Sequence, residues 1–241
     1  MQSEVSVLGI PIAPLTMEEA VSVIDGLIEN KKPSLIATAN AEMVMMAQQD
    51  AVLADILRSA SLVVPDGAGV VWAARQMGMP VPERVAGYDL AQKLLAISGR
   101  KGYRLYFLGA APGIAAKAKL YAEHNYPGVT IVGVRDGYFQ PADEDAVIAE
   151  ITDIRPDILL VALGVPRQEK WLANNLDKLQ VPVSMGVGGT FDVMAGVVAR
   201  APAWMQQSGL EWLYRLLKQP HRALRMLALP RFVLKVLLTK K

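Results

Sequence analysis

The sequence contains no cysteine and only two histidines, His124 and His221, among its 241 residues. Without cysteine the chain has no disulfide, no thiolate nucleophile, no cysteine-ligated zinc site and no iron–sulfur cluster. Two histidines give little basis for a histidine-bound metal or a Ser-His-Asp triad, and no Gly-x-Ser-x-Gly segment is present. A Gly-x-x-x-x-Gly-Lys-Ser/Thr P-loop is also missing, which argues against an NTPase. These absences favour chemistry performed by carboxylates and arginines.

Long apolar runs are missing too, since no stretch of about 18 residues lacks both charge and proline. Residues 1–4 do not resemble the basic start of a secretory signal. With 52% apolar and 20% charged residues, the composition is that of a globular protein. We therefore expect an intracellular protein that does not span a membrane.

The net charge of +2 is unevenly distributed along the chain. Residues 1–200 hold 17 Lys and Arg against 22 Asp and Glu, a net charge of −5, whereas residues 201–241 hold 8 against Glu211 alone, a net charge of +7. We expect two parts, an α/β domain over residues 1–195 and a basic, amphipathic, helical C-terminal appendage over residues 196–241. Because the body is acidic and no nucleic-acid-binding module is visible, we expect no nucleic-acid partner.

The expected appendage is rich in Leu, Met and Trp, and Pro220 and Pro230 are predicted to divide it into short helices. Its apolar face includes Trp212 and Leu216, and Arg222 and Arg225 share one face of a second short helix. A basic amphipathic segment with Trp suits an anionic membrane surface. The alternative is a C-terminal helix packed on the body with its basic face in water.

Short β-branched runs alternate with helical segments in the body, which predicts an α/β fold with a Rossmann-like, mostly parallel sheet and helices on both faces. After a strand or hairpin at 5–12, strands are expected at 34–38, 62–64, 104–108, 129–134, 157–163 and 181–187. Helices are expected at 16–29, where Thr16 to Glu19 has the capping-box form, and at 41–59, 89–97, 141–154 and 167–179. One more helix is expected to begin at residue 68, and another to follow the 109–113 turn and end near residue 123.

Ligands of such sheets bind at the carboxyl ends of the strands, so the residues that end strands are the candidate site residues. They are Thr38, Asn40, Asp66, Gly109 to Gly113, Asp136, Gly164 to Gln168 and Gly186 to Asp192. We expect these residues to gather along one rim of the sheet.

Asp66 can act as a general base if its carboxylate faces the pocket, although the local sequence by itself favours capping of the following helix. Thr38 and Asn40 allow the same two interpretations, because both residue types are common in caps and turns. Arg84 can bind a phosphate or pair with Glu83 next to it.

Two glycine-containing turns are candidate phosphate sites. The turn at 109–113 can place amides against a phosphate, with Asp136 positioned for a ribose, or it can be an ordinary tight βα turn. The turn at 186–190 is the stronger candidate, with packing alone as the alternative. Asp143 and Asp145 have the spacing of an Asp-x-Asp metal motif, but they more simply charge the first turn of a helix after Pro141. We therefore expect no metal and no cofactor.

Several segments together resemble the bacterial WecG/TagA/CpsF glycosyltransferase family, family 26. They are Thr38-Ala39-Asn40, Pro65-Asp66-Gly67, Arg84-Val85-Ala86-Gly87, Leu108-Gly109-Ala110-Ala111-Pro112-Gly113, Asp136-Gly137-Tyr138-Phe139, Gly164-Val165-Pro166-Arg167-Gln168-Glu169, Gly186-Val187-Gly188-Gly189-Thr190-Phe191-Asp192, Arg200-Ala201-Pro202 and Gly209-Leu210-Glu211-Trp212-Leu213-Tyr214-Arg215. The resemblance spans nearly the whole chain, and the order and spacing of the segments are specific.

The resemblance implies an inverting enzyme at the inner face of the cell membrane. It implies transfer from a UDP-sugar, typically UDP-N-acetylmannosamine, to a polyprenyl-diphosphate-linked sugar in teichoic-acid or other cell-surface polysaccharide synthesis. Glucose or uronic-acid donors are the alternatives within the family. A homo-oligomer is possible.

Carried over by position, the resemblance implies a role for each matching residue. Asp66 would be the general base with Thr38 and Asn40 beside it. The remaining implied site residues are Arg84 and Gln168 for substrate positioning, Gly137, Tyr138, Gly188 and Asp192 for the nucleotide, and Arg215, Arg222 and Arg225 of the appendage for the diphosphates.

This chemistry is coherent, because inversion needs one carboxylate to take the acceptor proton and positive charge to stabilise the leaving UDP. We expect removal of residues 201–241 to abolish transfer and to leave a folded body. Two other classes of protein remain as alternatives. One is a nicotinamide-dependent oxidoreductase that uses the 109–113 turn, and the other is a non-catalytic membrane-docking module.

Overall fold

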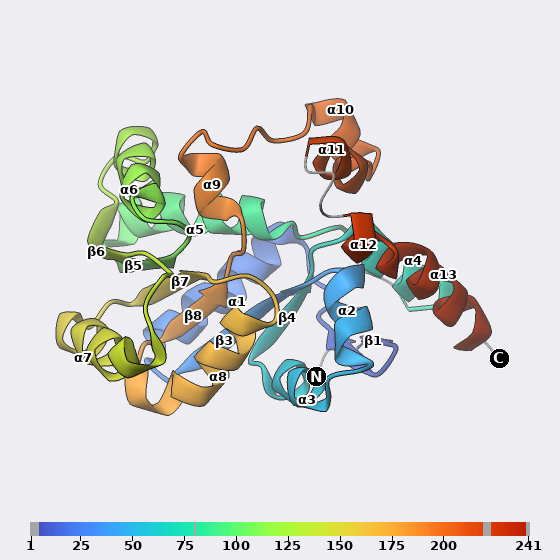
Figure 1. The fold of residues 1–241 in the computed structure, drawn as a ribbon, viewed down its shortest axis with the longest axis horizontal. Coiled ribbons are helices and arrows are strands. Elements are labelled where there is room, and N and C mark those ends of the chain that lie inside the picture. Colours follow the sequence, from blue (N-terminus) through green and yellow to red (C-terminus); the bar gives the residue numbers. More distant parts are fainter. Residues whose placement is uncertain (1–4, 80, 219–222, 240–241) are drawn as a thin grey trace.

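The computed structural model describes residues 5–79, 81–218 and 223–239. At its centre lies a six-stranded parallel sheet in the order β4-β3-β8-β7-β5-β6 (Figure 1). Its strands are β3 (Ser34–Ala39), β4 (Leu62–Pro65), β5 (Arg104–Gly109), β6 (Thr130–Arg135), β7 (Ile158–Ala162) and β8 (Val183–Gly186). The predicted α/β fold with a parallel sheet is confirmed, and every strand expected in it is present.

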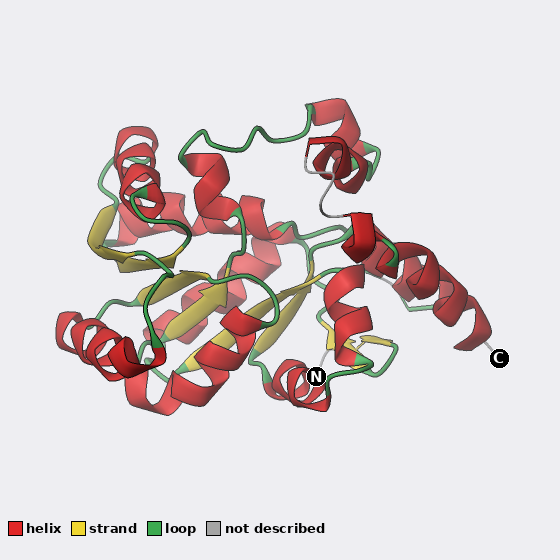
Figure 2. Ribbon diagram, in the orientation of Figure 1, coloured by secondary structure: helices red, strands yellow, loops and turns green. Residues whose placement is uncertain are grey.

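Helices pack on both faces of the sheet, as predicted (Figure 2). One face carries α1 (Met17–Glu29), α5 (Gly87–Lys101), α6 (Ile114–Asn125) and α9 (Thr190–Met194). The other side holds α2 (Ala41–Ala47), α3 (Ala51–Ser59), α4 (Ala68–Gln76), α7 (Glu144–Ile154) after the short 3-10 helix η1 (Pro141–Asp143), and α8 (Arg167–Leu179).

Burial on both faces explains why the strands are continuous apolar runs and not alternating ones. All six residues of β3 and all five of β7 are buried. In β3, Leu35 and Ala37 pack in the cluster with α2, α3 and α8, whereas Ile36 packs in the cluster with α1 and α5. The hydrophobic core therefore has two layers separated by the sheet.

The N-terminal segment forms a separate two-stranded hairpin of β1 (Val5–Val7) and β2 (Ile10–Ile12). The expected capping box of α1 is present, because the Thr16 side chain accepts from the Glu19 amide and the Glu19 carboxylate accepts from the Thr16 amide. Helix α1 ends at Glu29, as predicted.

The helix predicted over 41–59 is wrong as a single element. It is two helices, α2 and α3, which break at Gln48 to Asp50. The Asp50 side chain accepts a hydrogen bond from the Leu53 amide, 3.1 Å away, and so caps the start of α3. An aspartate in this position favours a new helix start over continuation of the preceding helix.

The C-terminal segment consists of α10 (Ala203–Gln207), α11 (Glu211–Lys218), α12 (Ala223–Met226) and α13 (Ala228–Thr239). Helix α13 packs against α2 and α4 through Phe232 and Val236, which belong to the same core cluster as those helices (Figure 1). Pro230 does not separate two helices as expected, because it occupies the first turn of α13, where its missing amide costs no hydrogen bond. Pro220 lies outside the described residues.

Within the described ranges, none of the helices combines the length and the apolar character that crossing a bilayer requires. The division of the chain at residue 195 stays a prediction.

Candidate active site

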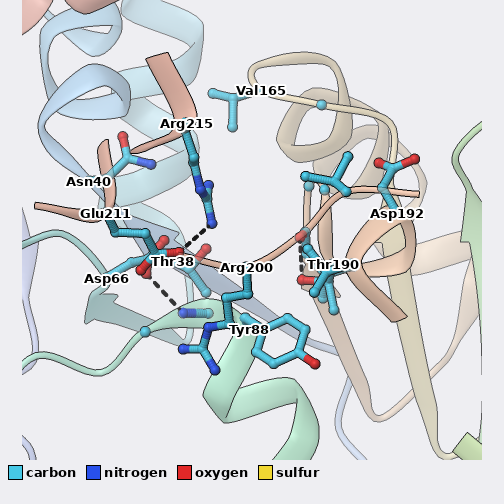
Figure 3. Close-up of a pocket in the computed structure, with 18 of the residues that line it drawn as sticks. Thr38, Asn40, Asp66, Tyr88, Val165, Thr190, Asp192, Arg200, Glu211 and Arg215 are labelled. Atoms are coloured by element: carbon cyan, nitrogen blue, oxygen red, sulfur yellow. Dashed lines mark hydrogen bonds and ion pairs between the residues drawn. The ribbon is translucent and has the colours of Figure 1, made fainter. Parts of the chain in front are cut away.

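A cavity of about 320 Å³ opens at the carboxyl ends of β3, β4, β7 and β8. Parallel strands present their carboxyl ends at the same edge, so residues far apart in sequence meet there. The predicted site residues that line this cavity are Thr38, Asn40, Asp66, Gln168, Gly188, Asp192, Arg215 and Arg225. The wall is completed by residues of the segment before α10 and by α11, among them Arg200 and Glu211 (Figure 3).

Asp66 follows β4 directly and faces the cavity. Its Oδ1 accepts a hydrogen bond from the Gly87 amide, 2.9 Å away, at the start of α5. The interpretation as the cap of the following helix is wrong, because Gly67 is the N-cap of α4 and no side chain caps it. Burial raises the pKa of the Asp66 carboxyl, while the Gly87 amide and the guanidinium groups of Arg215 and Arg84 oppose that rise.

Thr38 and Asn40 end β3 beside Asp66 (Figure 3). Asn40 caps α2, because its Oδ1 accepts from the Met43 amide at 3.0 Å, so its helix-capping interpretation is confirmed. Thr38 is 8% exposed, and a Cβ on Gly87 would lie 3.1 Å from its Oγ1. The glycine therefore allows α5 to approach β3 closely enough to bring its first amide to Asp66.

The interpretation in which Arg84 pairs with Glu83 is wrong, because Arg84 pairs with Glu211. Its Nη2 donates to Oε2 of Glu211 at 3.2 Å, and Oε1 of the same carboxylate accepts from Nη2 of Arg215 at 2.8 Å. Glu211 was not among the predicted site residues. The helical spacing of Glu211 and Arg215 indicates their pair, but the sequence carries no sign that Arg84, 127 positions away, joins it.

Arg200 is a second residue that the sequence interpretation missed. Its two terminal nitrogens donate to the two carboxylate oxygens of Asp89 at 2.7 and 2.6 Å, and its guanidinium lies over the Tyr88 ring, 4.5 Å from the ring centre. A bidentate pair with a stacked ring holds a planar guanidinium in one orientation. It fastens the segment that leads into α10 to the start of α5.

Gln168 is buried at the start of α8, with 1% of its surface exposed. Its Oε1 accepts from the amides of Gly164 and Gly188 at 3.1 and 3.2 Å, and its Nε2 donates to Glu169 at 2.8 Å. One side chain thus joins the loops that follow β7 and β8. Burial raises the pKa of Glu169 to about 7, and its Oε2 has no hydrogen-bond partner among the described residues.

The turn at 186–190 forms the opposite wall of the cavity from Asp66 (Figure 3). A Cβ at Gly186 would lie 2.5 Å from the Nε2 of Gln168, so only glycine leaves room for that buried amide. Thr190 donates through Oγ1 to the Val187 carbonyl at 2.7 Å, and Asp192 follows in the first turn of α9.

Comparison with known proteins decides the family. The family model described as glycosyl transferase WecG/TagA/CpsF family matches residues 5–241. The chain belongs to this glycosyltransferase family.

Two similar relatives carry one name, N-acetylglucosaminyldiphosphoundecaprenol N-acetyl-beta-D-mannosaminyltransferase. The protein from Bacillus subtilis (strain 168) is 38% identical over 214 residues, which covers 89% of this chain and 83% of the relative. The protein from Bacillus spizizenii (strain ATCC 23059 / NRRL B-14472 / W23) is 39% identical over 210 residues, covering 87% and 81%. The predicted family and enzyme class are confirmed, and a nicotinamide-dependent oxidoreductase is not favoured.

In this glycosyltransferase two of the expected nucleotide contacts lie toward the other end of the sheet. Gly137 follows β6, and Tyr138, 71% exposed, lines a second hollow of about 420 Å³ that Gly113 and Asp136 also line. Asp136 accepts from the Tyr138 amide at 2.9 Å. The contribution of Gly137 and Tyr138 to nucleotide binding stays a prediction.

The turn at 109–113 connects β5 to α6 by close backbone packing. A Cβ on Gly109 would lie 2.4 Å from the Ala162 carbonyl oxygen, and Gly113, at φ 80°, precedes the first turn of α6. Both glycines thus have a structural role, whatever else the turn binds.

Two C-terminal arginines, Arg215 of α11 and Arg225 of α12, line the cavity. Arg225 of α12 lines the cavity, where its Nε donates to Glu42 of α2. Arg222 lies outside the described residues.

The acidic residues with Asp-x-Asp spacing lie at a helix start, as expected. Asp143 ends η1, where it accepts from the Gln140 amide at 3.0 Å, and Asp145 lies in the first turn of α7. That the enzyme uses no metal stays a prediction.

Proposed function

We propose that this protein transfers N-acetylmannosamine from UDP-N-acetylmannosamine to N-acetylglucosamine-diphosphoundecaprenol, with inversion at the anomeric carbon. The observation that carries the proposal is the half-buried Asp66 carboxylate in a cavity walled by arginines. The names of the relatives support the two sugars and the lipid.

Asp66 serves as the general base. As the acceptor hydroxyl oxygen attacks the anomeric carbon, its proton passes to Asp66, and the bond from the sugar to the β-phosphate oxygen breaks with its electron pair left on UDP. Attack from the side opposite the leaving group inverts the centre. The raised pKa of Asp66 supports this role, because a stronger base accepts the proton more readily.

The leaving UDP gains negative charge, and the cavity supplies positive charge to meet it. Arg200, Arg215 and Arg225 line the cavity, and Arg84 is hydrogen-bonded to Glu211, which also lines the cavity. Guanidinium groups bind phosphate oxygens bidentately and stay charged at all relevant pH values. We propose that Arg215 and Arg225, with Arg222, bind the diphosphates, while Asp192 and the 186–190 turn contact the nucleotide.

The lipid acceptor places the reaction at a membrane, and we propose that the C-terminal segment binds the cytoplasmic membrane surface. Exposed apolar side chains gather on α10 to α13, namely Trp204, Trp212, Leu217, Leu227, Val233, Leu234, Leu237 and Leu238. Lys218, Arg231 and Lys235 are exposed on α11 and α13. Apolar and basic side chains together bind anionic bilayers.

Vesicle binding tests this surface. Leu238→Asp should weaken binding to phosphatidylglycerol vesicles by about tenfold or more, because burial of one leucine contributes about 1.5–3 kcal/mol. The matched control is Leu120→Asp, at an equally exposed leucine of α6, which should bind like the wild type. Equal binding of all three proteins would show that α13 does not face the membrane.

Product analysis tests the reaction. The purified full-length protein is incubated with a panel of UDP-sugars and a short-chain lipid-diphosphate-N-acetylglucosamine, and the lipid product is identified by mass. We expect UDP-N-acetylmannosamine to add one N-acetylhexosamine to the lipid. Transfer only from UDP-glucose or a UDP-uronic acid would replace the proposed donor, and no transfer from any of them would refute the proposal.

The full chain is used because α13 is part of the core. Deletion of residues 201–241 would remove Phe232 and Val236 from their contacts with α2 and α4 and leave apolar surface exposed. Loss of transfer after that deletion would therefore not separate a catalytic role from a structural one.

A further inference from the structure

Glu211 lies where the C-terminal segment meets the catalytic cavity. It is the first residue of α11, its side chain is 14% exposed, and it lines the cavity next to Asp66 (Figure 3). Its two carboxylate oxygens have different partners: Oε1 accepts from Arg215 at 2.8 Å within α11, and Oε2 accepts from Arg84 at 3.2 Å in the loop before α5.

We propose that Glu211 is a positioning residue that ties α11 to the catalytic cavity, holding Arg84 and Arg215 on its two oxygens beside the base Asp66. The inference rests on the proposed function for its consequences in catalysis, but the tie itself is a property of the protein without substrate.

The charges explain why a carboxylate is needed at this position. Arg84 and Arg215 come from segments more than 120 residues apart, and two guanidinium groups in one corner repel each other. A shared carboxylate neutralises one of the two charges and fixes both groups before an anion arrives. Donors held in place in advance cost little reorganisation when charge develops in the transition state.

The same carboxylate acts on the general base. The groups that face Asp66 are the Gly87 amide of α5, Arg84 before α5, and Arg215 and Glu211 of α11, while Thr38 and Asn40 on its β3 side are uncharged. The two arginines lower the pKa of Asp66, and Glu211 raises it. If Glu211 loses its charge, its raising effect on the pKa of Asp66 disappears while the two arginines still lower that pKa, so Asp66 becomes a weaker base.

Glu211→Gln is the test, because glutamine keeps the size and one acceptor oxygen and removes the charge. We expect kcat for transfer to fall by about tenfold or more, the effect of losing a hydrogen bond between charged groups. We also expect the acid limb of the kcat–pH profile to move to lower pH. Glu211→Asp, which keeps the charge, should restore the position of that limb.

A second measurement needs no substrate. Amide hydrogen exchange over residues 211–218 should be faster in Glu211→Gln than in the wild type, with exchange in the strands of the sheet unchanged. The matched control is Glu29→Gln, which removes an exposed carboxylate paired with Lys101 far from the cavity and should change neither exchange over 211–218 nor the pH profile.

Coupling to Arg84 completes the test. If Arg84 acts through Glu211, the kcat losses of Arg84→Lys and Glu211→Gln should be less than multiplicative in the double variant. Wild-type kcat with an unmoved acid limb, or unchanged exchange over 211–218, in Glu211→Gln would overturn the proposal. If the wild type itself shows no transfer with the proposed sugars, the proposed function fails, and the exchange experiment still decides whether Glu211 holds α11.

Discussion

Asp66→Asn separates chemistry from folding at the centre of this site. The Asp66 Oδ1 accepts from the Gly87 amide at 2.9 Å, and the Oδ1 of asparagine can accept the same hydrogen bond. The variant therefore keeps the contact with the start of α5 and loses only the carboxylate that we propose as the proton acceptor. Alanine would also leave the Gly87 amide without this partner, at a cost of about 1–3 kcal/mol, so it is the poorer test.

Removal of a general base typically lowers a rate by about 10²- to 10⁴-fold, which corresponds to about 3–5 kcal/mol of activation free energy. Stability should change in the opposite direction. Burial raises the pKa of Asp66 in the folded protein, so the folded state favours the protonated carboxyl over the ionised one. The stabilisation that results is complete at a pH below the unfolded pKa and is lost as the pH rises through the folded pKa. Each unit of that rise removes about 1.4 kcal/mol of stability at neutral pH, and asparagine carries no such penalty.

The assay measures the kcat of transfer and the free energy of unfolding in urea for both proteins at neutral pH. We expect Asp66→Asn to be nearly inactive and at least as stable as the wild type. The wild-type rate should rise with pH through the raised pKa of Asp66, above the range of an ordinary aspartate. Asp55→Asn, at an exposed aspartate of α3, is the control and should change neither quantity. A variant with a tenth or more of the wild-type rate would refute the role of Asp66 as the base.

Two further predictions concern stability. Phe232→Ala should lower the free energy of unfolding in urea by about 3–5 kcal/mol, because the ring of this α13 residue is buried against α2 and α4. Leu234→Ala, at an exposed leucine of the same helix, should change that free energy little. Similar losses for both variants would show that α13 is not packed in the core. Glu169→Gln should remove a pH dependence of the free energy of unfolding. Burial raises the pKa of Glu169 to about 7, so the wild type should lose about 3 kcal/mol of stability as pH rises from about 4.5 to above 7. The variant should not show this loss. Parallel urea titrations of both proteins across that range check it, and equal slopes would contradict it.

The fold could be predicted from the sequence because its signals are local. Buried parallel strands appear in the sequence as short β-branched runs. The start of α1 is predictable because the hydrogen bonds of its capping box join Thr16 and Glu19, which are only three positions apart. The break between α2 and α3 at residues 48–50 was not predicted. Asp50 caps α3 there, but the local sequence is equally compatible with a helix that continues through it.

The site could be predicted in part. The carboxyl ends of parallel strands share one edge, so Thr38, Asn40 and Asp66 were expected to meet and do. Their individual roles could not be read, because aspartate and asparagine before a helix have the same preference for capping. Only the structure separated them: Asn40 caps its own helix, whereas the Asp66 carboxylate reaches across to α5.

The sequence by itself determined the α/β class, the chemistry available without cysteine, and the division of charge between an acidic body and a basic C-terminus. Only the tertiary structure decided which charges meet. Glu211, the one acidic residue of 201–241, lines the candidate active-site cavity and joins Arg84 to Arg215, and α13 packs into the core through Phe232. Pairing between residues more than 100 positions apart depends on how helices pack on the sheet, and no local preference of the chain records that packing.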